Sequence, residues 1–198
     1  EIKNLDIKIG NAISNAIKNR DFKGEPNESK LLYVNAPNLK YIAILGLGKE
    51  EKFSLSKLTE SIGSLSKKLR ASNISSFSIY FNSLRSKKYD IKSSIEKITI
   101  AILLASYQFN KYKTQELEKI KKLDNVSLIV DKSMLLEAEK IINEAALFAE
   151  TVNKTRDLVN TPPNIATPSY IADYAQEVAR KNSLKCTILE EKEIEKLG

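Results

Sequence analysis

Apolar side chains recur at every third or fourth position in several stretches of the chain, which is the spacing of an amphipathic helix. The first stretch predicts a helix over residues 3–19. A second follows Ser54 and a third follows Asp90, two residue types that commonly cap helix N-termini. The longest helical pattern covers residues 133–160. The stripe after Ser54 consists of Leu55, Leu58, Ile62, Leu65 and Leu69, and the stripe after Asp90 of Ile91, Ile95, Ile98, Ile102 and Ala105.

Short apolar or alternating runs between these helices predict β-strands. The expected strands cover residues 31–35, 41–45, 76–81, 126–130 and 184–189. In the last of them Cys186 alternates with Leu184 and Ile188, which predicts that the cysteine is buried. Because strands and helices alternate, we expect an α/β fold in which helices cover both faces of a sheet.

Proline placement marks the end of the longest helix and the start of the next. The run Thr161-Pro162-Pro163 ends it, since proline lacks a donor and disfavours helix at the preceding residue. Thr167 followed by Pro168 is a typical helix start. A further helix is expected over residues 191–197. The domain boundary is therefore expected in or just after the long helix.

The composition indicates a globular chain without a membrane span. The chain has 198 residues, of which 42% are hydrophobic and 29% charged. Its longest apolar stretches, Tyr41–Leu45 and Ile100–Ala105, are far shorter than the roughly 20 residues that cross a bilayer. No signal peptide is visible at the N-terminus. The single cysteine fits a reducing compartment, so we expect a cytoplasmic protein.

The net charge of +7 raises the question of nucleic-acid binding. The positive charge is mostly lysine and is spread along the chain, which favours a solvated surface over a nucleic-acid site. The densest run, Lys111 to Lys122, also contains acidic residues. Within it, Tyr107, Phe109 and Tyr112 alternate with lysines as in a single-strand binding strip. We favour a helix end whose aromatic rings pack into the core.

The chain contains no histidine, which excludes His-based triads and His metal ligands. Metal chemistry in the protein would use Asp, Glu, Lys and backbone oxygens. The carboxylate pairs Glu50-Glu51, Glu137/Glu139 and Glu190-Glu191 lie in polar surroundings and are interpreted as solvated charges. We therefore predict no catalytic, cofactor-binding or metal-binding residue in this chain.

A glycine-containing turn follows the strand at 41–45. Gly46 and Gly48 stand where backbone N–H groups could cradle a phosphate at a helix N-terminus. However, Glu51 replaces the third glycine of the dinucleotide fingerprint, and Glu50 replaces the Ser or Thr of a P-loop. A tight turn that requires small residues is the favoured interpretation, and a phosphate site is the alternative.

A longer motif resembles the domain junction of the leucyl aminopeptidases, which carry R-D-L-x-N-x-P-x-N-x-x-x-P-x-x-h-A there. The matching segment runs from Thr155-Arg156-Asp157-Leu158-Val159-Asn160-Thr161-Pro162-Pro163-Asn164 to Thr167-Pro168-Ser169-Tyr170-Ile171-Ala172. Weaker matches lie at residues 43–49, 105–113 and 191–198. The resemblance therefore covers most of the chain.

The resemblance implies a hydrolase that removes N-terminal residues from peptides, a metalloprotease and exopeptidase with two divalent ions, Mn²⁺ or Zn²⁺. It implies a hexamer, no membrane partner and a three-layer α/β/α, macro-domain-like N-terminal domain. Such a domain, with its glycine turn, leaves a nucleotide- or ADP-ribose-binding module as the alternative function, and nucleic-acid binding as a further one.

The resemblance also divides the chain. Residues 1–132 correspond to the N-terminal α/β domain, 133–161 to a connecting helix and 162–198 to a truncated start of the catalytic α/β domain. The family's metal ligands and catalytic residues lie beyond Gly198, so this chain alone is expected to be non-catalytic and to serve assembly or regulation. Arg156, Asp157, Asn160 and Asn164 are assigned a structural role at the domain interface.

Overall fold

The structure is a computed structural model that describes residues 2–37, 39–86 and 88–198. The chain divides into two compact units, Glu1–Asn153 and Lys154–Gly198. The boundary between them falls inside the long helix α5 (Leu135–Asn160).

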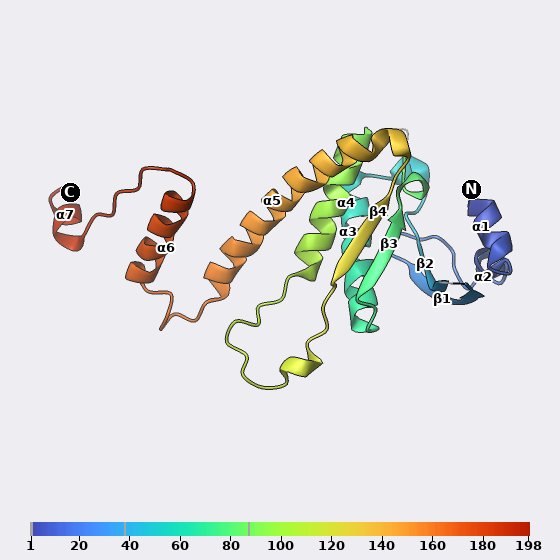
Figure 1. Ribbon diagram of the computed structural model, residues 1–198, viewed down its shortest axis with the longest axis horizontal. Helices are drawn as coiled ribbons and strands as arrows, with labels where there is room; N and C mark the ends of the chain where they lie inside the picture. Colours follow the sequence, from blue (N-terminus) through green and yellow to red (C-terminus); the bar gives the residue numbers. More distant parts are fainter. Residues whose placement is uncertain (1, 38, 87) are drawn as a thin grey trace. The chain divides into compact units, whose positions relative to one another are not determined.

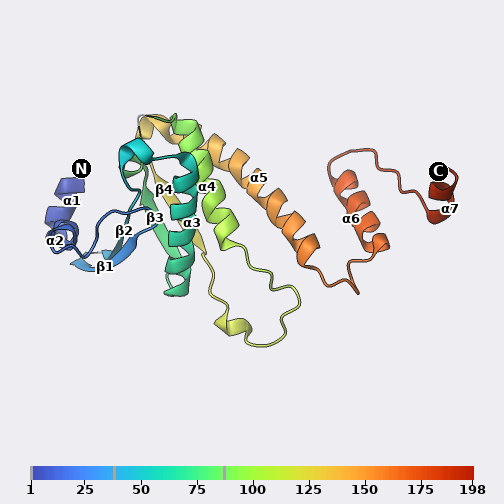
Figure 2. The same ribbon diagram turned by 180° about the vertical axis from the view of Figure 1, so that it is seen from behind.

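The centre of the first unit is a pair of helices packed on a two-stranded parallel sheet. Helices α3 (Leu55–Ala71) and α4 (Ile91–Ser106) lie side by side in both views (Figures 1 and 2). Strands β3 (Ser76–Tyr80) and β4 (Asn125–Ile129) form the sheet. The predicted helices and strands of this region are therefore confirmed.

Local sequence signals begin both helices. The Ser54 hydroxyl accepts a hydrogen bond from the Lys57 N–H at 3.3 Å. The Asp90 carboxylate accepts one from the Ser93 N–H at 2.7 Å. Each side chain satisfies one of the backbone donors that a helix N-terminus leaves without an intrahelical partner. Both predicted caps are confirmed.

The two faces of the β3–β4 sheet differ in polarity because side chains alternate along a strand. Phe77 pairs in register with Val126, and Ile79 with Leu128, so these four apolar side chains share one face and pack on the core. The opposite face carries exposed serine side chains, including that of Ser78. The α/β class is confirmed, with the described strands arranged in two small sheets.

The core joins residues from α3, α4, the sheet and the first half of α5. Leu58, Phe81 and Ile95 are completely buried, and Ile98 is 1% exposed. Ala138 and Ile141 bring α5 into the same cluster. The remaining buried members are Phe53, Ile62, Ile79, Ala101 and Ile102. Burial of this apolar surface is the main source of the unit's stability.

The second sheet is an antiparallel hairpin of β1 (Ser29–Ala36) and β2 (Leu39–Leu45). Both strands were predicted, and the structure lengthens each. On its outer face the rings of Tyr33 and Tyr41 meet edge to face with centroids 5.7 Å apart.

The single helix predicted over residues 3–19 is wrong. The segment forms α1 (Ile2–Lys8) and α2 (Ala12–Lys18), separated by Gly10 and Asn11, which have φ values of 70° and 58°. The Asp6 carboxylate accepts hydrogen bonds from the N–H groups of Ile13 (2.8 Å) and Ser14 (3.1 Å) and from the Ser14 hydroxyl. The turn is thus stabilised by a side chain from the preceding helix.

Short 3-10 helices complete the connections of the first unit. They are η1 (Glu50–Lys52), η2 (Phe81–Ser83), η3 (Leu117–Lys119) and η4 (Lys132–Met134). Residues 110–124 form a charged loop, which has no regular structure apart from η3.

The second unit contains α6 (Pro168–Lys181) and α7 (Glu191–Glu195). Thr167 caps α6 as predicted, since its hydroxyl accepts a hydrogen bond from the Tyr170 N–H at 3.3 Å. The strand predicted at 184–189 is wrong, because that segment has no regular structure. A strand is stable only beside a partner strand, and the described part of this unit supplies none. Cys186 is consequently exposed, not buried as predicted.

Replacement of Leu58 by alanine tests the assigned core. Leu58 is completely buried, so Leu58→Ala is expected to lower the free energy of unfolding by about 2–5 kcal/mol. The matched control is Leu136→Ala, because Leu136 is 82% exposed and its loss should change stability by less than about 0.5 kcal/mol. Urea unfolding followed by circular dichroism measures both. Equal effects of the two substitutions would contradict the assigned core.

The turn at Asp6 predicts a measurable titration. The hydrogen bond from the Ser14 hydroxyl lowers the pKa of Asp6, burial opposes this, and the N–H groups of Ile13 and Ser14 lower it further. Because the folded pKa lies below the unfolded one, the carboxylate stabilises the turn above the unfolded pKa of about 3.9 and loses this effect as pH falls through the folded pKa.

Nuclear magnetic resonance tests this expectation directly. The amide resonances of Ile13 and Ser14 should titrate with a midpoint below that of an ordinary aspartate, and Asp6→Asn should remove the transition. A midpoint at or above the ordinary value would contradict the assigned hydrogen bonds.

Candidate functional site

The backbone donors of the glycine turn are occupied within the protein. The Gly46 N–H donates to the Glu28 carbonyl at 2.7 Å, and the Gly48 N–H donates to the Gly24 carbonyl at 2.9 Å. A phosphate cradle needs these groups directed at the ligand. The turn therefore joins the end of β2 to the segment before β1, which agrees with the favoured interpretation of a tight turn.

Close backbone approach explains why these positions are glycine. A Cβ on Gly46 would lie 2.1 Å from the Glu25 carbonyl oxygen, and one on Gly48 would lie 2.8 Å from Cγ of Pro26. Gly48 also has a φ of 74°, in the left-handed region that favours glycine. The glycines thus serve packing between two loops.

The carboxylate pairs considered as acid/base or metal groups lie apart and make local contacts. Glu50 and Glu51 are exposed in η1, where their carbonyl oxygens accept hydrogen bonds from the Lys88 ammonium at 2.8 and 2.7 Å. Glu190 belongs to the capping box of α7. Among the described residues, no cluster of three or more Asp, Glu, Cys or His side chains could hold a metal ion.

The lysine–aromatic stretch after α4 is not helical. Because α4 ends at Ser106, the interpretation of these aromatics as part of a helix end is wrong. The Phe109 and Tyr112 rings meet edge to face with centroids 5.7 Å apart, and the Lys111 ammonium lies 5.5 Å from the Tyr112 centroid. The rings therefore contact each other and a cation instead of presenting parallel faces for successive bases.

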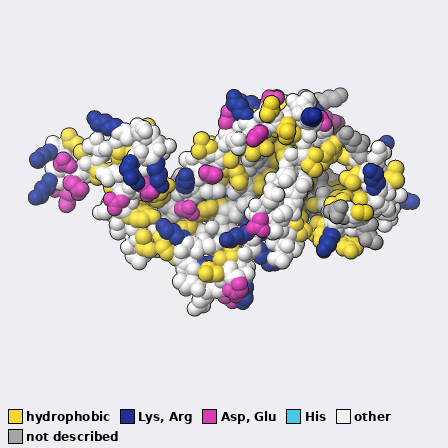
Figure 3. Space-filling model, viewed as in Figure 1, with side chains coloured by type: hydrophobic (Ala, Val, Ile, Leu, Met, Phe, Trp, Pro, Cys, Tyr) yellow, Lys and Arg dark blue, Asp and Glu magenta, His cyan; other side chains and the backbone are white. Residues whose placement is uncertain are grey.

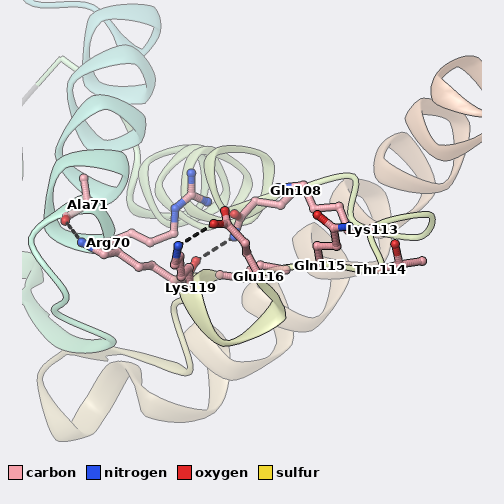
Figure 4. A pocket seen from close by; sticks show the side chains of 10 residues that line it. Arg70, Ala71, Gln108, Lys113, Thr114, Gln115, Glu116 and Lys119 are labelled. Carbon is pink, nitrogen blue, oxygen red and sulfur yellow. Dashed lines mark hydrogen bonds and ion pairs between the residues drawn. The ribbon is translucent and has the colours of Figure 1, made fainter.

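The same loop walls a hollow of about 620 Å³ at the C-terminal ends of α3 and α4, which we call the basic hollow (Figure 4). Its lining residues are Arg70, Ala71, Gln108, Lys113, Thr114, Gln115, Glu116, Lys119, Ile120 and Lys121. Lys113, Lys119 and Lys121 belong to the basic run considered above as a single-strand binding strip, but the hollow itself was not predicted, because it also needs Arg70 of α3 beside that run. A smaller hollow of about 270 Å³ lies between α4, α5 and the sheet and is lined mainly by apolar side chains.

Elsewhere the charges are mixed. On the face displayed in Figure 3, basic and acidic side chains are interspersed among apolar and neutral ones. Exposed ion pairs such as Lys181–Glu177 and Lys140–Glu144 follow helical spacing. This distribution resembles a solvated surface, as the sequence predicted. No described helix combines the length and apolarity that crossing a bilayer requires.

The junction motif forms a closed turn between α5 and α6. The Thr161 hydroxyl donates to the Asp157 carbonyl at 2.7 Å, and Thr161 is only 6% exposed. The N–H groups of Ile165 and Ala166 both donate to the Pro162 carbonyl at 2.9 Å. Arg156, Asp157 and Asn160 lie on the last turns of α5, and Asn164 lies in the turn that follows.

Two family models match the chain. The N-terminal domain of the cytosol aminopeptidase family matches residues 1–116, and the catalytic domain of the same family matches residues 153–198. The chain belongs to the cytosol aminopeptidase family. The second match begins at Asn153 and contains the whole junction motif, so the resemblance found in the sequence is confirmed.

Relatives within the cytosol aminopeptidase family agree with this assignment. A probable cytosol aminopeptidase of Rippkaea orientalis is 31% identical over 200 residues, which include 100% of this chain and 39% of the relative. A probable cytosol aminopeptidase of Sulfurihydrogenibium is 33% identical over 205 residues, which include 100% of this chain and 39% of the relative. The chain thus spans about two fifths of the length of these relatives.

Solved structures share the fold. A mutant of tomato leucine aminopeptidase superposes with a TM-score of 0.78 at 21% identity, covering 98% of this chain and 38% of that one. The bottromycin maturation enzyme BotP in complex with Mn superposes with a TM-score of 0.75 at 18% identity, and the match covers 92% of this chain and 36% of that one.

Alanine substitution tests the glycine turn. Gly46→Ala is expected to lower the melting temperature, because its Cβ would overlap the Glu25 carbonyl and force the two loops apart. Gly63→Ala is the matched control, since the nearest atoms to its Cβ are 3.7 Å away and alanine favours helix by about 1 kcal/mol. Gly63→Ala should leave the protein as stable or more stable. Unchanged melting of Gly46→Ala would contradict the close approach.

Proposed function

We propose that this chain is the N-terminal part of a two-metal leucyl aminopeptidase that removes N-terminal amino acids from peptides. The observation that carries the proposal is the pair of matches in chain order, the family's N-terminal domain and then the beginning of its catalytic domain. The similar fold of tomato leucine aminopeptidase supports it.

Within the whole protein, residues 1–132 form the N-terminal α/β domain, residues 133–161 the connecting helix, and residues 162–198 the start of the catalytic domain. The N-terminal domain serves assembly or regulation of a homo-oligomer, a hexamer, in the cytoplasm. Arg156, Asp157, Asn160 and Asn164 hold the junction between the domains. The division of the contacts into two units inside α5 supports this arrangement.

The described residues of this chain do not fit a two-metal site, since they form no cluster of three metal-ligating side chains. We therefore assign the metal-binding and catalytic residues to the part of the family's length that this chain does not span. The Mn named with BotP supports manganese as one of the two candidate metals, zinc being the other.

The alternative functions have less support. A nucleotide- or ADP-ribose-binding module would need the N–H groups of Gly46 and Gly48, which already donate to carbonyl groups of the protein. Nucleic-acid binding would need a continuous basic surface, whereas the face in Figure 3 mixes both signs of charge.

Activity measurements test the proposal. The protein at the length of its relatives should hydrolyse a leucine anilide after addition of Mn²⁺ or Zn²⁺. Removal of the metal by a chelator should lower kcat/KM by at least about a thousandfold, because metal ions supply several kcal/mol of transition-state stabilisation. The 198-residue chain, assayed in parallel, should show no turnover. A folded longer protein that is inactive with either metal would contradict the function, and turnover by the chain would contradict its non-catalytic role.

A further inference from the structure

We propose that the basic hollow binds a small anion that carries two or more phosphate groups. The hollow lies entirely within the first unit, between the C-terminal ends of α3 and α4 and the loop that leads to β4. The proposal does not depend on the aminopeptidase function. It rests on the charges that line the hollow, on their hydrogen bonds and on its size.

The lining gathers positive charge that the protein does not neutralise. Arg70, Lys113, Lys119 and Lys121 face a single carboxylate, that of Glu116, which leaves an excess of three positive charges. In the view of Figure 4, Arg70 and Lys119 lie on one side of Glu116, and Lys113 and Thr114 lie on the other. Like charges that surround one space repel each other, so an anion within the hollow would stabilise the arrangement.

Helix capping accounts for two of the four cations. Nη1 of Arg70 donates to the carbonyl oxygens of Ala105 (3.2 Å) and Ser106 (3.1 Å) at the end of α4. The Lys121 ammonium donates to the Ala71 carbonyl at the end of α3 at 2.6 Å. Cations at helix C-termini are favourable by themselves. These contacts also hold the two side chains at the rim, where each retains further N–H donors.

Helix capping does not account for the other two cations, Lys113 and Lys119. Lys119 pairs with Glu116, which neutralises the only carboxylate in the lining. Lys113 makes no side-chain hydrogen bond or ion pair with any residue that the structure describes. Glu116 itself has a φ of 55°, which is uncommon for a residue with a side chain. The hollow is therefore more basic than helix capping requires.

The chemistry of the lining selects the class of ligand. A volume of about 620 Å³ lies within the range of small-molecule sites, roughly 300–1,000 Å³. Arginine and lysine donors match the oxygens of phosphate groups. None of the lining residues is aromatic, so the hollow offers no surface on which a base would stack. Cations on opposite sides favour an anion with at least two charged groups over a single phosphate.

Titration calorimetry with inorganic tripolyphosphate tests the site. The unmodified chain should bind tripolyphosphate more tightly than inorganic phosphate at low salt. Lys113→Gln should weaken binding about tenfold, the loss of one charge-assisted hydrogen bond. The matched control is Lys92→Gln, which makes the same change of charge at an exposed position on α4 outside the hollow. Its affinity should equal that of the unmodified chain.

Lysine acetylation, read by mass spectrometry, gives a second measurement on the unmodified chain. Tripolyphosphate should protect Lys113 from acetylation and leave Lys92 unprotected. Absence of binding heat, or equal weakening by Lys113→Gln and Lys92→Gln, would overturn the proposal. So would equal protection of both lysines. Binding of a single-stranded oligothymidylate that Lys113→Gln weakens, without any binding of tripolyphosphate, would assign the hollow to nucleic acid instead.

Discussion

The packing of α3 and α4 against the parallel pair β3–β4 is the interaction on which the first unit depends. Leu58 and Ile95 are completely buried at the centre of this packing, one from each helix. Between Tyr80 at the end of β3 and Asn125 at the start of β4 lie 44 residues that include the whole of α4, so the strands pair only because this core brings them together. The sheet in turn supplies the apolar face that α5 covers with Ala138 and Ile141.

The same packing creates the basic hollow, because it brings the C-terminal ends of two helices to one edge of the unit. Exposed helix ends present carbonyl groups that lack intrahelical partners. Arg70 and Lys121 donate hydrogen bonds to these carbonyl groups. The loop between α4 and β4 places further lysines around them. A structural need for helix capping and a capacity to attract anions therefore arise from one feature of the fold.

Local signals allowed much of the fold to be predicted. Ser54, Asp90 and Thr167 cap their helices as expected, since a cap depends on a few neighbouring residues. The break between α1 and α2 was missed because it depends on the Asp6 side chain folding over the turn. The strand at 184–189 was wrongly predicted, because alternating apolar and polar side chains show only that a segment could pair with a partner strand. The run from Lys111 to Lys122 supplies three of the cations of the basic hollow, but the hollow itself could not be predicted, because it forms only where this run packs beside Arg70 at the end of α3.

The course of α5 through the boundary of the two units has a consequence for how the chain unfolds. Its main-chain hydrogen bonds run without interruption past Asn153, where one unit ends and the other begins. Breaking the helix there would leave backbone N–H and C=O groups without hydrogen-bond partners on both sides of the break. Helix formation is cooperative, so loss of order in one unit propagates as fraying into the other, and the two should melt as linked transitions instead of independent ones.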